Sequence, residues 1–338
     1  MSTNKVIITG VTGQDGAYLA NDLIKKNFKV YGAIRRGGSP KTYRLKELDI
    51  INKISFISLE VTELANVIRV FSEIKPDYIY NLAAQSFVAD SFMHPHYTSS
   101  VNYLGVLNIL EAINLLKLDV KFYQASTSEM YGEIKQEIQN ENTPFNPISP
   151  YAISKLASHY LVKNYRIAYN IHASSGILFN HESEFRGLEF VTRKISSWIS
   201  EIKKGNKGPI PLGALGSTRD WGYAPEYVQA MQLINESDKA DDYVVATNTN
   251  YTVRQFLEWC CNELDYDVYF EGENENEICI DKKSGQKIAY VDKQYFRPSD
   301  VKNLYGSYNK INSKLGWKPK TFARDIAKIM TRYDYNKK

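Results

Sequence analysis

The amino-terminal segment constrains the fold of this chain more than any other feature. Val6-Ile7-Ile8-Thr9 is a short β-branched run, and apolar residues at helical spacing follow from Tyr18. Between them lies a glycine-rich turn that contains Gly10, Thr12, Gly13, Gln14, Asp15 and Gly16. Strand, glycine turn and helix in this order can hold the pyrophosphate of a dinucleotide at a helix N-terminus. We therefore predict a dinucleotide site here, although an ordinary turn with helix packing would have the same spacing.

The end of the second predicted strand indicates which dinucleotide is bound. Residues 29–34 form an apolar run that ends at Arg35 and Arg36, where an acidic residue would hold the ribose 2′-hydroxyl of NAD. Two guanidinium groups favour a 2′-phosphate, so we expect NADP, the alternative being a solvated basic turn. A third predicted strand, 54–59, leads to Glu60 and Val61, where an adenine ring could lie.

Strands and helices then alternate, with a helix over 64–74, a strand over 78–82, a helix over 101–116 and a strand over 121–125. This alternation predicts an α/β fold of the Rossmann type, a doubly wound parallel sheet with ligands at the strand ends. Small residues after the strand 78–82 allow the backbone to approach a cofactor. This segment contains Leu82, Ala83, Ala84 and Ser86.

The length of 338 residues predicts a smaller α/β lobe beside the main domain. We expect residues 1–180 to form the cofactor domain, with a returning segment near 220–250. Residues 181–219 and 251–338 would then form mainly a substrate-binding lobe. The polar composition of residues 271–286 predicts an exposed excursion.

Tyr151 and Lys155 are the candidate catalytic pair. Pro150 favours a helix that starts at or near Tyr151, which places the two side chains one turn apart on one helix face. A phenol has a pKa of about 10, and a neighbouring cation favours its ionised form, so the pair could act as a general base. The same spacing recurs elsewhere in the chain, and this pair is favoured by the Ser126-Thr127-Ser128-Glu129 cluster upstream.

Composition and charge exclude several other classes. The formal net charge of +4 and the pI near 8.6 are too mild to indicate nucleic-acid binding. No apolar run is long enough to span a membrane and no signal-type segment precedes the first strand, so we expect a cytoplasmic protein. The cysteines Cys260, Cys261 and Cys279 lack metal-ligand spacing, so we expect packing residues and no metal site.

Spaced cations follow in the second half of the chain. Arg186, Arg193 and Lys194 lie in one short region, while Arg219 and Arg297 come later. Such groups could converge on a diphosphate, although each alone is most often a surface residue.

Several longer motifs together resemble one family, the GDP-mannose 4,6-dehydratases of the extended short-chain dehydrogenase/reductase class. The likeness covers nearly the whole chain. It is carried by Gly10-x-x-Gly13-x-x-Gly16, Asn81-Leu82-Ala83-Ala84-Gln85-Ser86, Tyr123-Gln124-Ala125-Ser126-Thr127-Ser128-Glu129, Ser149-Pro150-Tyr151 with Lys155, Gly176-Ile177-Leu178-Phe179-Asn180-His181-Glu182-Ser183, Phe190-Val191-Thr192-Arg193-Lys194, Arg219-Asp220-Trp221-Gly222, Tyr295-Phe296-Arg297-Pro298 and Leu315-Gly316-Trp317-Lys318-Pro319.

The resemblance implies conversion of GDP-D-mannose to GDP-4-keto-6-deoxy-D-mannose, with NADP as a resident redox catalyst. Tyr151 would remove the 4-hydroxyl proton while hydride passes from C4 to NADP, and Lys155 would hold the nicotinamide ribose. Glu129 would take the C5 proton and, with Thr127, assist loss of the 6-hydroxyl before hydride returns to C6. The sugar nucleotide would contact Ser86, Thr127, Ser128, Glu129, Tyr151, Asn180, Lys194, Arg219 and Arg297.

Three alternatives stay open. Glu184 stands where the family has a proline near the sugar pocket, which leaves room for a GDP-heptose as substrate. An NADP-dependent nucleotide-sugar epimerase or reductase would use the same fold but has no comparable need for Glu129. A non-catalytic NADP-binding regulatory protein would have no use for the catalytic set. The resemblance also implies a homodimer or homotetramer.

Overall fold

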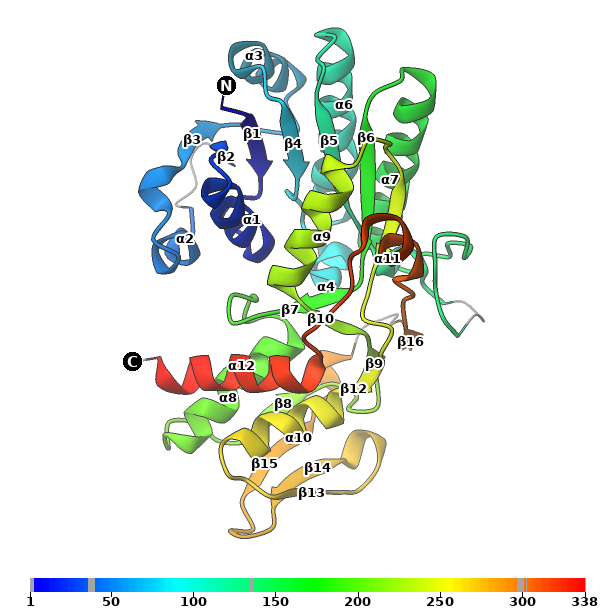
Figure 1. The fold of residues 1–338 in the computed structure, drawn as a ribbon. Helices are drawn as coiled ribbons and strands as arrows, with labels where there is room; N and C mark the ends of the chain where they lie inside the picture. Colours follow the sequence, from blue (N-terminus) through cyan, green and yellow to red (C-terminus); the bar gives the residue numbers. More distant parts are fainter. Residues whose placement is uncertain (1–2, 36–39, 134–136, 297–300, 302, 338) are drawn as a thin grey trace.

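The computed structural model of this chain describes residues 3–35, 40–133, 137–296, 301 and 303–337. They form a larger body around a seven-stranded sheet and a smaller lobe below it, and the carboxyl-terminal helix lies across the boundary (Figure 1).

The larger sheet is parallel throughout. Its strands are β1 (Lys5–Thr9), β2 (Lys29–Ile34), β3 (Ser55–Ser58), β4 (Tyr78–Asn81), β5 (Lys121–Thr127), β6 (Ala173–Leu178) and β11 (Asp242–Val245). They lie in the order β11-β6-β5-β4-β1-β2-β3, and every neighbouring pair is parallel. This confirms the predicted Rossmann-type α/β fold. The strand order reverses at β1, so the carboxyl ends of β1 and β4 are where such sheets bind ligands.

Helices cover both faces of this sheet (Figure 1). They are α1 (Gln14–Lys25) and α9 (Ala224–Glu236) on one face, and α3 (Leu64–Ile74), α6 (Gly105–Leu115) and α7 (Pro150–Ala168) on the other. Successive residues of β1 show the two faces, because Val6 and Ile8 join a buried cluster with Met231 of α9, whereas Ile7 packs with Phe71 of α3. Side chains alternate across a strand, so a continuous apolar run supplies both layers.

The helix predicted over 101–116 departs from regular geometry at its start. Residues Ser100–Leu104 form a π-helical turn, and α6 begins only at Gly105. Such turns are rare and frequently occur at functional sites. The shorter helices of this body are α2 (Tyr43–Glu47), α4 (Val88–Met93), α5 (Pro95–Ser99) and α11 (Asn309–Leu315).

The smaller lobe has its own core. Its helices are α8 (Val191–Lys203), α10 (Val253–Glu263) and α12 (Ala323–Asn336), and its sheet has the order β13 (Val268–Glu271), β14 (Ile278–Asp281), β15 (Lys287–Val291) and β8 (Ile210–Leu212). Ile199, Phe256 and Met330 bring the three helices into one buried cluster. The side chain of Thr252 accepts the Gln255 N–H and Gln255 reciprocates, which caps the start of α10.

The prediction of an exposed excursion over 271–286 is wrong for its central part. Residues Ile278–Asp281 form an inner strand of the lobe sheet, and Cys279 within it is fully buried. A half-buried strand needs an apolar residue only at alternate positions, so its mean composition resembles that of a loop. The three cysteines are buried and free, in agreement with the predicted packing role.

Two small sheets lie between the bodies (Figure 1). They pair β7 (Asn180–Glu182) with β10 (Trp221–Tyr223), and β9 (Thr218–Arg219) with β12 (Tyr251–Thr252) and β16 (Asn303–Leu304). Asp220, between β9 and β10, is fully buried and accepts hydrogen bonds from the Thr247 N–H at 2.9 Å, the Thr247 hydroxyl at 2.7 Å and the Asn248 N–H at 3.1 Å. Burial raises the pKa of Asp220 to about 7. Through β10 and α9, residues 221–245 return to the larger sheet.

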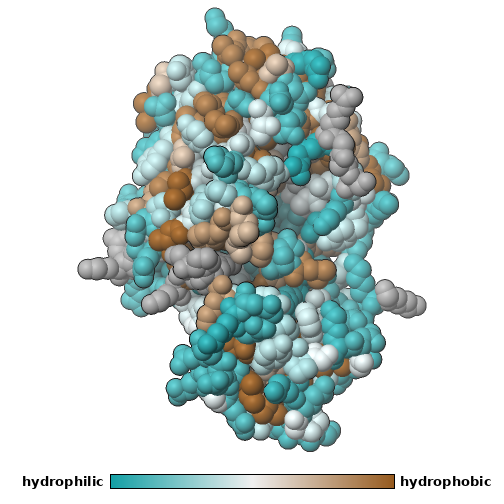
Figure 2. All heavy atoms as spheres, turned by 180° about the vertical axis from the view of Figure 1, so that it is seen from behind, coloured by the Kyte–Doolittle hydropathy of each residue, from teal (hydrophilic) through white to brown (hydrophobic). Residues whose placement is uncertain are grey.

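The surface differs between the two bodies. Figure 2 shows a mostly hydrophilic smaller lobe and more hydrophobic patches on the larger body, seen from behind. Of the helices described, none is long and apolar enough to cross a bilayer. Within the same part of the chain, no three His, Cys, Asp or Glu side chains gather in a way that would suit a metal ion.

Candidate active site

The glycine turn connects β1 to α1 at the middle of the sheet. Gly10 has φ +69°, and a Cβ atom there would lie 2.9 Å from the Leu82 carbonyl carbon, so both the conformation and the space require glycine. Gly13 is the N-cap of α1, and no side chain caps the first N–H groups. An uncapped helix N-terminus beside a tightly packed glycine turn is suited to bind a phosphate.

The segment after β4 is held against this turn by Thr9. Its hydroxyl accepts the N–H groups of Leu82 and Ala83, both at 3.0 Å, and donates to the Asn81 amide oxygen at 2.7 Å. The backbone of residues 82–84 is thereby fixed beside the glycine turn. Ser86, at the far end of the segment, is exposed.

The predicted adenosine end is more open. The exposed Arg35 guanidinium donates a hydrogen bond to the phenol of Tyr97, a residue of α5 that sequence reasoning missed. Arg36 lies outside the described residues. The carboxylate of Glu60 accepts the Thr62 hydroxyl at 2.9 Å, and Val61 is buried.

The candidate catalytic residues meet where β5 ends and α7 begins. Ser149 caps α7 by accepting the Ala152 N–H at 3.1 Å, and Pro150 occupies its first turn, as the sequence predicts. The Lys155 ammonium donates to the Ala125 carbonyl, and the interaction of Thr127 with the Tyr151 phenol lowers the pKa of that phenol. Thr127 also accepts the Glu129 N–H at 3.2 Å, at the start of a single 3-10 turn, Ser128–Met130. The four candidate residues therefore come from three elements that adjoin here: β5, the 3-10 turn and α7.

The ionisation of this pair differs from the expectation of a ready phenolate. Burial raises the pKa of Tyr151 to about 12, a rise that the Thr127 hydrogen bond opposes and the charge of Glu129 reinforces. Burial also lowers the pKa of Lys155 to about 8. Both side chains are more than nine-tenths buried, so desolvation of the charged forms outweighs the one-turn spacing from which the prediction was made.

The substrate-binding residues predicted in the second half of the chain lie at the boundary and in the smaller lobe. Asn180 starts β7 and is partly buried. Ser128, from the first half of the chain, is buried at the start of the 3-10 turn. The Lys194 ammonium donates to the Pro211 carbonyl at 2.5 Å and lies 3.4 Å from the centre of the Tyr295 ring. Burial lowers its pKa to about 8. Arg219 is buried and donates to the Thr218 carbonyl at 2.8 Å, while Arg297 lies outside the described residues.

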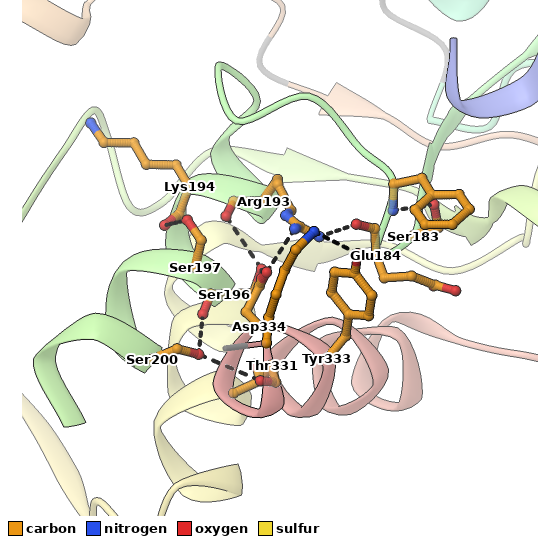
Figure 3. A network of polar contacts seen from close by, with 12 residues as sticks. Ser183, Glu184, Arg193, Lys194, Ser196, Ser197, Ser200, Thr331, Tyr333 and Asp334 are labelled. Carbon is orange, nitrogen blue, oxygen red and sulfur yellow. Dashed lines mark hydrogen bonds and ion pairs between the residues drawn. The ribbon is translucent and has the colours of Figure 1, made fainter. Parts of the chain in front are cut away.

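Arg193 does not face the same way as its neighbour Lys194. Its guanidinium lies 2.6 Å from the Asp334 carboxylate and also donates to the Glu184 carbonyl, whereas Lys194 points away from this network (Figure 3). Ser196 donates to the other carboxylate oxygen at 2.7 Å. Arg193 thus joins α8 to α12 instead of contributing to a cluster of cations for a diphosphate.

Comparison with known proteins identifies the family. A sequence model described as GDP-mannose 4,6 dehydratase matches residues 7–330.

The chain belongs to the GDP-mannose 4,6-dehydratase family.

Relatives with that name match over nearly their whole length. GDP-mannose 4,6-dehydratase of Vibrio cholerae is 43% identical, with 98% of this chain and 93% of the relative covered. The Homo sapiens enzyme is 41% identical, with 98% and 91% covered. A solved UDP-glucose 4-epimerase of Thermus thermophilus, in complex with NAD, has a TM-score of 0.80 at 24% identity and covers 98% of this chain and 99% of its own. That likeness shows the fold alone.

One further residue of this family member, Asn102, lies beside the candidate site, and sequence reasoning missed it. Asn102, in the π-helical turn, donates to the Gln85 carbonyl and to the Ser154 hydroxyl, both at 3.1 Å, and so links the segment after β4 to α7. Only long-range contacts give Asn102 its place, and no local motif signals it. Arg186, one of the cations that the sequence suggested for a diphosphate, is engaged by a carboxylate of its own segment. Arg186 lies 3.2 Å from the Glu182 carboxylate and 3.7 Å from the centre of the Phe190 ring.

Proposed function

We propose that this protein converts GDP-D-mannose to GDP-4-keto-6-deoxy-D-mannose and water. Membership of the dehydratase family and the names of its full-length relatives support this assignment. The observation that carries it is the meeting of Thr127, Glu129, Tyr151 and Lys155 where β5 ends and α7 begins. An epimerase needs the tyrosine and the lysine, but only dehydration needs a carboxylate beside the sugar.

NADP is the cofactor that we propose for the glycine turn. The uncapped N-terminus of α1 and the close packing of Gly10 on Leu82 fit a pyrophosphate, and Arg35 fits a 2′-phosphate. When bound, NADP takes a hydride from the sugar and returns it, so the sugar undergoes no net oxidation. The residues that would surround it are Gly10, Thr12, Gly13, Gln14, Asp15, Gly16, Arg35, Arg36, Glu60, Val61, Leu82, Ala83, Ala84, Ser86, Tyr151 and Lys155.

Tyr151 is the proposed base for the sugar 4-hydroxyl. Its raised pKa keeps the phenol protonated in the free protein, and Thr127 favours the phenolate. Lys155, when protonated, would stabilise the phenolate further. The Ala125 carbonyl accepts a hydrogen bond from the Lys155 ammonium and so fixes the position of this side chain. Glu129 would take the C5 proton, which the neighbouring ketone acidifies, and would deliver a proton to the departing 6-hydroxyl with help from Thr127.

The sugar nucleotide would lie between the two bodies. Asn180, Ser86 and Ser128 would contact it from the larger body, and Lys194, Arg219 and Arg297 would bind its diphosphate. Lys194 is already engaged by Pro211 and Tyr295, so it must leave the carbonyl, or share its hydrogen bonds, when a diphosphate enters.

We further propose a homodimer or homotetramer in the cytoplasm. Ile153, Tyr160 and Ile167 lie seven residues apart on α7 and are 56%, 53% and 74% exposed. A stripe with this spacing is suited to pack against a second helix of the same kind. Light scattering of the purified protein, and of an Ile167→Lys variant, tests this assembly.

Product analysis tests the function. The protein, supplied with NADP, is incubated with GDP-mannose and separately with GDP-heptose, and the masses of the products are measured by mass spectrometry. Loss of one water from GDP-mannose supports the proposal, loss only from GDP-heptose redirects it to that substrate, and an unchanged mass indicates epimerisation. Glu129→Gln should abolish water loss, whereas the exposed Glu73→Gln on α3 should not. Dehydration at full rate by Glu129→Gln would contradict the assignment.

A further inference from the structure

A carboxylate lies in the middle of the turn that we assign to a pyrophosphate. Asp15 belongs to the first turn of α1, and its side chain is 22% exposed. A negative charge there interacts favourably with the helix dipole, but it repels an anion that binds at the same N-terminus. The turn can bind a pyrophosphate well only if this charge is balanced.

His181 supplies the balance. Its Nε2 lies 2.8 Å from the Asp15 carboxylate and its Nδ1 lies 2.8 Å from the Phe179 carbonyl oxygen. A carbonyl can only accept, and so can an ionised carboxylate, so each ring nitrogen must carry a hydrogen. A histidine with two N–H groups is an imidazolium. The ring is buried and stacks on Tyr227, with 4.6 Å between the ring centres, so it cannot turn away to another partner.

The neutral arrangements are poorer. If either nitrogen lost its proton, its lone pair would face an oxygen at 2.8 Å, and a buried acceptor would lose its donor. Protonation of Asp15 instead is disfavoured, because its pKa is lowered. Burial opposes that lowering, but the charge and hydrogen bond of His181 outweigh it. Burial likewise opposes the charging of His181, and the attraction of Asp15 overcomes it, so the pKa of His181 is raised.

Groups from several neighbouring elements face the pair. From α2, the Arg44 guanidinium donates to the Thr12 carbonyl at 3.0 Å and interacts with the charge of Asp15. Arg186, after β7, opposes the positive charge of His181. Gln14 of α1 donates to the Asp15 carboxylate and to the His181 carbonyl, both at 3.1 Å, and accepts the Ser183 hydroxyl at 2.8 Å. Tyr227 comes from α9. The 181–183 segment and the first turn of α1 therefore form one bonded unit.

We infer that His181 is a positioning residue, an imidazolium that neutralises Asp15 and fastens the cofactor turn to the strand that carries Asn180. The inference rests on the assignment of the turn to NADP for its consequence, but not for the protonation state itself. Loss of the imidazolium would remove the direct ion-pair partner of Asp15 and leave more of its negative charge beside the pyrophosphate.

The protonation state can be measured without any ligand. The chain has five histidines, and His181→Gln assigns the signals of His181 in ¹⁵N-histidine NMR spectra of the free protein. Near pH 8, which is about 1.5 units above the ordinary histidine pKa, both nitrogens of His181 should give imidazolium signals. Asp15→Asn should convert them to those of a neutral ring. A neutral His181 in the unmodified protein would overturn the inference.

Binding of NADP, measured by calorimetry, tests the consequence. His181→Gln should weaken NADP binding at least tenfold, because Asp15 is left unbalanced. The double variant Asp15→Asn with His181→Gln should bind NADP more tightly than His181→Gln alone. A purely structural role predicts the reverse, since the double variant loses more contacts, and that result would overturn the charge balance.

Two controls separate this inference from its foundation. His172→Gln, whose ring contacts the Ser237 carbonyl at 3.0 Å, should leave NADP binding unchanged. Thermal unfolding of each variant shows whether the fold is kept. If the unmodified protein binds no NADP, the cofactor assignment and the charge-balance consequence both fail, while the NMR result still decides the protonation of His181.

Discussion

The two halves of the proposed site are held in different ways. In the catalytic half, Tyr151 and Lys155 are buried and fixed by partners on β5, so their pKa values are shifted before any ligand binds. In the substrate half, Lys194 is engaged by the Pro211 carbonyl, and its neighbour Arg193 is used in an ion pair that joins α8 to α12. The catalytic residues are thus positioned before a ligand binds, whereas Lys194 must give up a contact within the protein in order to bind the diphosphate. Variants should therefore affect kcat in one half and KM or stability in the other.

The largest effect is expected from Tyr151→Phe. Loss of a general base lowers a rate by about 10²–10⁴-fold, and the ring keeps its packing, so kcat should fall while KM for GDP-mannose changes little. Steady-state kinetics, with the product identified by mass spectrometry, measures kcat and KM. Tyr160→Phe is the matched control, because Tyr160 is on the same helix but is 53% exposed. A large rise in KM with kcat kept would place Tyr151 in the substrate half.

Next in size is the effect of Arg193→Met on stability. Arg193 and Asp334 form a buried ion pair at 2.6 Å between α8 and α12, and removal of one partner leaves a buried charge (Figure 3). The free energy of unfolding should fall by about 3–5 kcal/mol in urea denaturation. Lys282→Met, which breaks a pair with Asp267 in which the two side chains are 52% and 72% exposed, should cost less than about 1 kcal/mol. Equal losses of unfolding free energy in the two variants would contradict the expected difference between a buried and an exposed ion pair.

Lys155 should make stability depend on pH. Its pKa is about 8 in the folded protein and about 10.4 when unfolded, so the unfolded chain binds more protons between these values. The free energy of unfolding should therefore rise with pH across this window, by up to about 3 kcal/mol. Urea denaturation of the unmodified protein and of Lys155→Met at several pH values isolates the contribution of Lys155 to the pH dependence of stability. The same pH slope in both proteins would show that Lys155 is not desolvated.

The sequence predicts the catalytic half better than the substrate half, for physical reasons. Apolar β-branched strands, glycine turns and the Pro150 helix start are local signals, and they determine where Tyr151 and Lys155 lie. The Asp15 to His181 contact joins residues 166 positions apart, so only the folded chain shows it. Arg193 and Lys194 look equivalent in sequence, yet adjacent residues on a helix point in directions about 100° apart, and they face different partners.

Lys194→Gln should act on substrate binding. A charged hydrogen bond to a diphosphate contributes about 1.5–3 kcal/mol, which corresponds to a rise in KM for GDP-mannose of roughly 10–150-fold with kcat nearly kept. Lys203→Gln is the matched control. It removes a lysine from the same helix that also donates to a carbonyl, that of Leu264 at 2.6 Å, and lies over a tyrosine ring. A similar KM for both variants would remove Lys194 from the substrate half.

The smallest effect should come from Tyr97→Phe, at the proposed adenosine end of the cofactor site. The phenol accepts a hydrogen bond from Arg35, and its loss frees the guanidinium to sample other positions. One such bond contributes about 0.5–1.5 kcal/mol, so the preference for NADP over NAD should fall roughly twofold to twelvefold. Binding of both cofactors to this variant and to the control Tyr269→Phe, in the smaller lobe, measures the change. Arg35 is exposed, whereas Tyr151 and Lys155 are buried. A loss of NADP preference as large as the loss of kcat in Tyr151→Phe would contradict a site whose catalytic half is organised around its buried pair.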